Sequence, residues 1–343
     1  MTANGDSWRA LRRLSWLGAA LVLAGVGGRD VAADVSVPRS ERVADGCAGA
    51  GGARRAGCPG SVTVGAAKPS VGPVCGKQLS VGRVVGSVSE SGVQESLLGA
   101  SASGATLLFL RSPWHTCVSS SHGTALLLAD RADAGAAAYT IADVTALPAF
   151  ARFARAEATM TVGPDGNDVI GSAARFDGFL VSSRSGSGAT DFGTPVAGPF
   201  VAINAALPRP AWIGWPVLSA DGLAFYYKIQ ESGDARRDGI YEAVRSSTNV
   251  AFPVGTRMPE LVQRWGSVTG IAADRLTLYV TRDFGTQLLT RASTSAPFAE
   301  QPGVASPVSA YRVAPIDGCR LIGTCEPGGC WREDICVWSA TTP

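Results

Sequence analysis

The two histidines of the chain, His115 and His122, lie in one polar stretch, residues 111–122, that also holds Trp114, Cys117 and four serines. Serine hydrolases of the α/β type carry their nucleophile in a Gly-x-Ser-x-Gly turn, and one large class of zinc peptidases carries His-Glu-x-x-His on a helix. Neither motif occurs in the sequence. We therefore expect a long polar loop with surface histidines, no catalytic residue, no metal and no cofactor.

An aspartate recurs in short turns between apolar runs, and an acidic residue displayed in this way could also do chemistry. Asp221-Gly222 is the clearest case, and glycine there accepts the positive φ that a two-residue hairpin turn needs. The five turns are Ser103-Gly104, Asp165-Gly166, Asp221-Gly222, Asp274-Arg275 and Asp317-Gly318, at intervals of 62, 56, 53 and 43 residues. We expect the aspartate to hydrogen-bond the backbone of its own turn, and not to act as a calcium ligand or a sialidase-type acid.

A second repeated feature follows each of the first four turns, where an apolar run ends in arginine. The four runs are 125–131, 179–184, 240–245 and 288–291, and three of them lead to a phenylalanine, at Phe192, Phe252 and Phe298. Both features are clearest in 218–226, 240–245 and 290–298, where the chain resembles the TolB-like, WD-repeat-like β-propellers of exported bacterial proteins. The resemblance covers about residues 90–340 and is weaker where Ser103 replaces aspartate and Arg275 replaces glycine.

The repeats predict an all-β fold, a β-propeller of about five four-stranded blades, since each interval fits one blade. A sixth blade is possible if residues 61–95 hold a degenerate repeat. The last repeat lacks an outermost strand after Trp338, and residues 76–89 alternate well enough to supply it. Such an exchange would close the ring and remove an exposed sheet edge. We expect residues 75–343 to form the propeller.

Blade topology also predicts where a ligand would bind. The loop between the second and third strands of a blade and the connection to the next blade open at the same end of the ring. Trp212 and Trp265 each precede their turn aspartate by nine residues, so we expect equivalent positions, either at this end or packed between blades. Aromatic residues and arginine are typical of binding surfaces. The candidate ligand-binding residues are Trp114, His115, Trp212, Trp265, Arg236, Arg237, Asp283 and Trp331.

Eight cysteines are typical of an exported, oxidised protein. If residues 319–324 and 333–338 pair as a hairpin, Cys319 can lie opposite Cys336, and Cys325 opposite Cys330. We therefore predict these two cross-strand disulfides, because the spacing lacks the Cys-x-x-Cys knuckle of most structural zinc sites. Cys47, Cys58, Cys75 and Cys117 have no connectivity that the sequence can decide.

The first 33 residues have the pattern of an export signal, with Arg9, Arg12 and Arg13 before a short apolar run at 17–28 and small residues at 31–33. The apolar run is shorter than a membrane span needs. A Gly-, Ala- and Pro-rich leader is expected over 34–74. The net charge of +2, without basic and aromatic residues interleaved, argues against nucleic acid as a partner.

The resemblance implies an interaction scaffold. We expect a noncatalytic, monomeric protein, periplasmic or extracellular, that binds a protein or glycan of the bacterial envelope and has no membrane span once its signal is removed. The alternative is a propeller hydrolase that acts on glycans or peptides, since propellers host both kinds of function.

Overall fold

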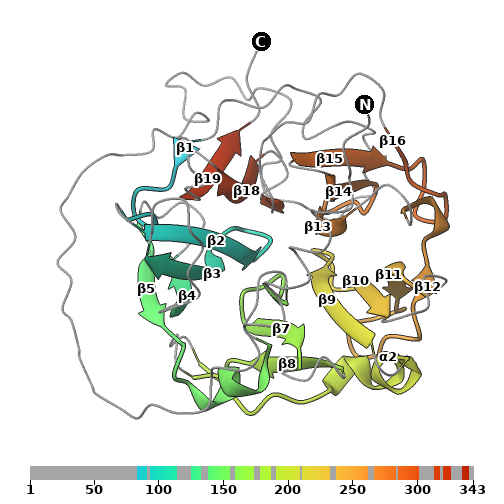
Figure 1. Ribbon diagram of the computed structural model, residues 1–343, viewed down its shortest axis with the longest axis horizontal. Helices are drawn as coiled ribbons and strands as arrows, with labels where there is room; N and C mark the ends of the chain where they lie inside the picture. Colours follow the sequence, from blue (N-terminus) through green and yellow to red (C-terminus); the bar gives the residue numbers. More distant parts are fainter. Residues whose placement is uncertain are drawn as a thin grey trace, which may run out of the picture. The chain divides into compact units, whose positions relative to one another are not determined.

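A computed structural model describes residues 83–90, 93–113, 125–132, 138–154, 159–173, 178–186, 191–208, 211–231, 237–261, 266–282, 285–300, 313–316, 320–325 and 334–339. They belong to one unit of the chain, residues 51–118 and 122–343. Within it, five antiparallel sheets surround a common centre as the blades of a β-propeller (Figure 1). The all-β prediction is confirmed, with five blades.

Each blade is a run of strands that are consecutive in sequence, apart from one exchange. Blade 1 comprises β2 (Val93–Ala100), β3 (Thr106–Pro113), β4 (Ala125–Asp130) and β5 (Thr140–Asp143). Blade 2 comprises β6 (Met160–Val162), β7 (Asp168–Ser172) and β8 (Phe179–Ser183). Blade 3 comprises β9 (Ala211–Leu218), β10 (Ala224–Glu231), β11 (Gly239–Val244) and β12 (Thr256–Arg257). Blade 4 comprises β13 (Ser267–Ile271), β14 (Thr277–Arg282), β15 (Gly285–Thr290) and β16 (Ala299–Glu300).

Blade 5 contains the exchange. It comprises β17 (Val313–Ile316), β18 (Arg320–Cys325), β19 (Asp334–Ser339) and, from the other end of the chain, β1 (Arg83–Val84). β1 pairs antiparallel with β19, with Val84 opposite Cys336. The prediction that the outermost strand comes from within residues 76–89 is confirmed for Arg83–Val84, while residues 76–82 lie outside the described part of the chain. The first strands of consecutive blades contact one another in the order β2, β6, β9, β13, β17 and back to β2, which closes the ring.

Blade 2 differs from the predicted four strands. Its outer edge is made by two isolated bridges, Val181 to Val196 and Arg184 to Phe192, in place of a fourth strand. Short helical segments lie between strands: η2 (Pro148–Arg152), η3 (Gly198–Phe200), α2 (Val201–Ala206) and η4 (Pro259–Leu261). Among the described residues, none of the helices is long and apolar enough to cross a membrane.

The hydrophobic core lies between the blades, because successive residues of a strand point to opposite faces and both faces are covered. On β3, Leu107 and Phe109 pack against blade 5, while Leu108 packs against blade 2. Each of the five interfaces between neighbouring blades has its own apolar cluster. Continuous apolar runs in the sequence therefore correspond to strands buried on both faces.

The repeated turns connect the first and second strands of a blade, and they are longer than predicted. The Ser219 N–H donates to the Ala224 carbonyl oxygen at 2.9 Å, which leaves four residues, 220–223, in the turn. The two-residue turn is therefore wrong. Positive φ is still required, at +69° for Gly222 and +60° for Arg275.

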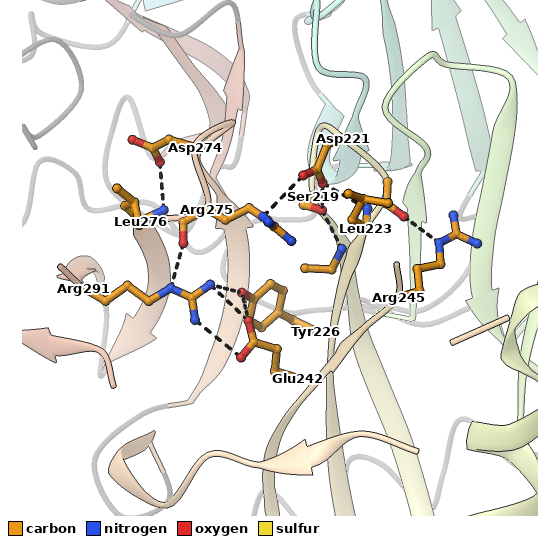
Figure 2. A network of polar contacts seen from close by, with 12 residues as sticks. Ser219, Asp221, Leu223, Tyr226, Glu242, Arg245, Asp274, Arg275, Leu276 and Arg291 are labelled. Atoms are coloured by element: carbon orange, nitrogen blue, oxygen red, sulfur yellow. Dashed lines mark hydrogen bonds and ion pairs between the residues drawn. The ribbon is translucent and has the colours of Figure 1, made fainter. Parts of the chain in front are cut away.

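The aspartate has the structural role that we predicted. Asp221 Oδ1 accepts a hydrogen bond from the Leu223 N–H at 3.0 Å, and Asp274 Oδ1 accepts one from the Leu276 N–H at 2.8 Å (Figure 2). Asp165 makes the same contact with the Asn167 N–H. An aspartate two residues before the donor in each turn thus fixes the backbone of that turn.

The repeated arginine follows the third strand and binds the turn of its own blade. Arg245 Nε donates to the Gly222 carbonyl at 2.8 Å, and Arg291 Nε donates to the Arg275 carbonyl at 2.9 Å (Figure 2). Each guanidinium also lies 4.3 Å from the centroid of the following phenylalanine ring, Phe252 or Phe298. The two repeated features of the sequence are therefore parts of one structural unit.

Two of these arginines also join neighbouring blades. Arg184 in blade 2 makes a two-pronged ion pair with Asp130 in blade 1, at 2.6 and 3.1 Å. Arg291 in blade 4 lies 3.2 Å from Glu242 in blade 3, and the Tyr226 hydroxyl donates to the same carboxylate (Figure 2). The Arg291 side chain is only 3% exposed, so this ion pair lies inside the interface between blades 3 and 4.

The described disulfide joins Cys325 to Cys336, with Cα atoms 5.8 Å apart. In the β18–β19 hairpin, Cys336 lies opposite Gly323, and Cys325 lies opposite Asp334. The predicted register is therefore wrong. The predicted pairs Cys319–Cys336 and Cys325–Cys330, which depend on that register, are wrong with it. Burial on one face fixes only whether a residue points in or out, so a four-residue slip keeps both cysteines on the buried face. Cys319 and Cys330 lie outside the described residues.

Candidate binding site

Two predicted ligand-binding residues, Trp212 and Arg237, belong to the described part of the chain. Both lie at the end of the ring that carries the loops between second and third strands, which we call the loop end. Trp212 is near the start of β9, opposite Gln230 near the end of β10. The remaining candidates lie outside the described residues: Trp114, His115, Trp265, Arg236, Asp283 and Trp331.

Trp212 is half-buried and folds back along its own strand. Its six-membered ring lies so close to Gly214 that a Cβ at position 214 would overlap it. The ring also meets Trp215 edge to face, with centroids 4.8 Å apart at 65°. Edge-to-face contact is a favourable geometry for aromatic pairs. The two indoles therefore form one aromatic surface on the innermost strand of blade 3.

Trp215 owes its position to a bulge in β9. Tyr226 pairs with Val217 but Lys228 pairs with Gly214, so β9 holds one extra residue in this stretch. Trp215 has φ of +49°, and among the described residues only Arg275 is another non-glycine residue with positive φ. Such a backbone costs on the order of 1–3 kcal/mol and often marks functional sites. The bulge turns the Trp215 ring toward Trp212.

Lys228 completes the group. Its ammonium lies 5.1 Å from the centroid of the Trp215 ring and donates a hydrogen bond to the Gly266 carbonyl of blade 4. Burial lowers the pKa of Lys228, and the negative charge of Asp238 partly opposes that change. We call Trp212, Trp215 and Lys228 the aromatic–lysine cluster.

The loop beside the cluster is held in place by backbone contacts. The Tyr241 hydroxyl donates to the Arg237 carbonyl at 2.8 Å, and Arg257 donates to the Asp238 carbonyl at 2.8 and 3.1 Å. These bonds leave the Arg237 side chain exposed. The exposed Arg237 side chain thus lies at the same end of the ring as the cluster, on a backbone that these bonds fix.

Sequence reasoning missed Trp215 and Lys228, although one signal was available for Lys228. Only three of the thirty basic residues of the chain are lysine, and Lys228 is the only one of these in the described residues. The position of Trp215 depends on the bulge, which the alternation of apolar residues does not reveal.

A polar pocket of about 340 Å³ lies elsewhere on blades 3 and 4 and is separate from the cluster. It is lined by Glu242 and Arg291 of the buried ion pair, together with residues of both blades, among them Arg257, Glu260 and Ser295. The charged groups at its base are already paired with each other. We therefore interpret the pocket as a solvent-accessible opening next to a structural ion pair.

A buried carboxylate stands on the innermost strand of blade 1. The Glu95 side chain is 0% exposed, and its Oε1 accepts a hydrogen bond from Arg111 Nε at 3.0 Å, while its Oε2 has no hydrogen-bond partner among the described residues. Burial raises the pKa of Glu95, and the Arg111 guanidinium partly opposes the rise. Arg111 also binds Glu90 and the Val88 carbonyl, so the pair anchors the segment that follows β1.

We predict that Glu95 gives the protein a measurable pH dependence of stability. Because the pKa is higher in the folded state, the native protein holds the proton more tightly than the unfolded chain. The contribution to stability is therefore present at acid pH and is lost as pH rises through the folded pKa. We expect the urea midpoint of the wild type, measured relative to that of Glu95→Gln, to rise as the pH is lowered from 8 to 4. A difference that does not vary with pH would contradict this.

Fold and cluster together define a five-bladed β-propeller with an aromatic–lysine surface at its loop end. No protein-family model matches the chain, and no curated protein does so. Similar solved structures include an α-L-arabinofuranosidase from Podospora anserina in complex with cellotriose, at 9% identity and a TM-score of 0.44, over 74% of this chain and 92% of that chain.

TolB from Acinetobacter baumannii is also similar, at 10% identity and a TM-score of 0.36, over 72% of this chain and 54% of that chain. A GH62 hydrolase in complex with xylotriose has 6% identity and a TM-score of 0.43, over 73% of this chain and 92% of that chain. Structural similarity at these identities and TM-scores supports no conclusion about the family or activity of the chain.

Proposed function

We propose that the protein is an exported, noncatalytic, TolB-like propeller that binds a glycan or protein of the bacterial envelope through the aromatic–lysine cluster. The observation that carries this proposal is the pair of half-buried indoles, held edge to face beside an ammonium by a strained bulge. Two aromatic faces and a cation near one another are typical of binding surfaces. Sugar rings present C–H faces that stack on indole, which favours a glycan.

The alternative, a glycan hydrolase, has less support from the innermost strands. Glycoside hydrolysis by the common mechanisms uses two carboxylates about 5–10 Å apart across the substrate. Among β2, β6, β9, β13 and β17, Glu95 is the only carboxylate, and it is bound to Arg111. We therefore place binding before hydrolysis as the function to test.

Replacing Trp215 with glycine should weaken ligand binding on the order of tenfold or more, as loss of a binding hot spot does. Glycine accepts the positive φ, so the bulge can persist without the ring. A glycan array and a pull-down from native envelope extract would identify the ligand, and titration of the ligand with both proteins would measure the loss. Thermal unfolding would show that the variant is folded.

Val254→Ser is a matched control for this test. Val254 is 56% exposed and lies between the third and fourth strands of blade 3, at the end of the ring opposite the cluster. It should bind as the wild type does. Binding that survives in Trp215→Gly but fails in Val254→Ser would contradict the proposed surface, and turnover of a bound glycan by the wild type would favour the hydrolase.

A further inference from the structure

We propose that the ligand of the aromatic–lysine cluster carries a carboxylate, as an acidic glycan does, and that Lys228 is the residue that binds it. This inference rests on the proposed function and names the chemistry of its ligand. Lys228 would contact the carboxylate while the indoles stack on the sugar ring.

Among the described residues, Lys228 has no close counter-charge. Its ammonium has three donors, and the contacts seen are one hydrogen bond to the Gly266 carbonyl and the face of Trp215. Among the described residues, no carboxylate lies within ion-pair distance of Nζ. Burying a charge without a partner is costly, and a bound carboxylate would supply that partner.

The described charges around the cluster favour an anion. Lys228 and the exposed Arg237 are positive, and Asp238 is the one carboxylate whose charge acts on Lys228. Asp238 only partly offsets the effect of burial on Lys228. A negative ligand would therefore meet complementary charge on one side of the indole pair.

The residue type fits this role. Most basic positions in the chain are arginine, whose guanidinium is broad, planar and charged at every relevant pH. An ammonium is compact and can fit between the Trp215 ring and the Gly266 carbonyl, and it can release its proton when buried. A carboxylate bound to Lys228 should raise the pKa of Lys228 again, so that binding takes up protons at a pH where the free ammonium is partly deprotonated.

A glycan array with matched pairs tests the proposal, each pair holding an acidic sugar and its neutral form, such as trigalacturonate and its methyl ester. The wild type should bind the acidic member on the order of tenfold more tightly. Lys228→Met should lose that preference and bind the two members of a pair with similar affinity. Titration calorimetry over a series of alkaline pH values, in two buffers of different ionisation enthalpy, should show proton uptake for the wild type. Lys228→Arg should show none, because arginine stays charged.

The outcomes separate this inference from the proposed function. If the wild type binds both members of a pair equally, or if Lys228→Met keeps the acidic preference, the carboxylate is not bound by Lys228, while binding at the cluster stands. If proton uptake persists in Lys228→Arg, another group takes up the proton and the inference fails. If no glycan binds in either form, and the envelope pull-down is unaffected by Trp215→Gly, both proposals fail.

Discussion

Replacing Arg291 with methionine should lower the free energy of unfolding by about 3 kcal/mol, at the lower end of the range for breaking a buried ion pair. Methionine keeps much of the apolar stem but leaves the Glu242 carboxylate without its cation inside the interface of blades 3 and 4. It also removes the hydrogen bond from Nε to the Arg275 carbonyl (Figure 2). Urea unfolding followed by circular dichroism would measure the loss.

The repeat supplies a matched control. Arg245 holds the equivalent position in blade 3, where it binds the Gly222 and Val250 carbonyls and lies over Phe252. Arg245→Met therefore loses the turn contact and the ring contact, and should cost only about 1 kcal/mol. The difference between the two variants isolates the ion pair. Equal losses in both would show that the bond to Glu242 adds nothing.

A second variant tests the origin of the loss. In Arg291→Met combined with Glu242→Gln, the interface no longer holds an unpaired charge, so we expect part of the stability to return. Tyr226 can still donate its hydroxyl to the new side-chain amide oxygen. If the double variant is as unstable as the sum of the two single variants, the two residues act independently and the ion-pair explanation is wrong.

The blade repeat could be predicted from the sequence because its signals are local. The turn aspartate bonds two residues along the chain, and the arginine binds the turn of its own blade. Residues with such short-range roles recur at similar spacing in most of the repeats and remain visible when loops vary in length. The same signals do not show the length of the turn, which is why the two-residue hairpin was wrong.

The candidate site was only partly predictable. Trp212 became a candidate from the sequence because Trp265 stands at the same distance before the next turn aspartate. Trp215 and Lys228 depend on a bulge and on a carbonyl of the next blade, Gly266. Neither the extra residue in β9 nor the partner of Lys228 follows from residue spacing, because both arise from how two blades pack. Features that distinguish one blade from the others are therefore the hardest to predict, and the proposed binding surface depends on them.

Removal of the Cys325–Cys336 disulfide should lower the free energy of unfolding by about 2–4 kcal/mol. The bond closes the β18–β19 hairpin, and Cys336 pairs directly with Val84 of β1. The strand that closes the ring is thus attached next to the disulfide. Since β1 is only Arg83–Val84, we expect loss of the bond to loosen the closing strand as well as the hairpin.

The double variant Cys325→Ala, Cys336→Ala is the appropriate protein, because one remaining cysteine could form other disulfides. Its urea midpoint should fall below that of the oxidised wild type. Hydrogen exchange should show faster exchange of the Val85 N–H, which donates to the Ile335 carbonyl at 2.8 Å. A reductant should lower the urea midpoint of the wild type more than that of the variant, because only the wild type has this bond to lose.

A peptide map under nonreducing conditions tests the pairing itself. The β18–β19 register places Cys336 opposite Gly323, diagonal to Cys325, so the map should recover a peptide linking 325 and 336. Recovery of Cys319 linked to Cys336 would instead require the strands to pair four residues out of this register. Because such a slip keeps the same residues buried, burial cannot choose between the two registers. The disulfide pairing that the map recovers therefore tests the β18–β19 register of blade 5 directly.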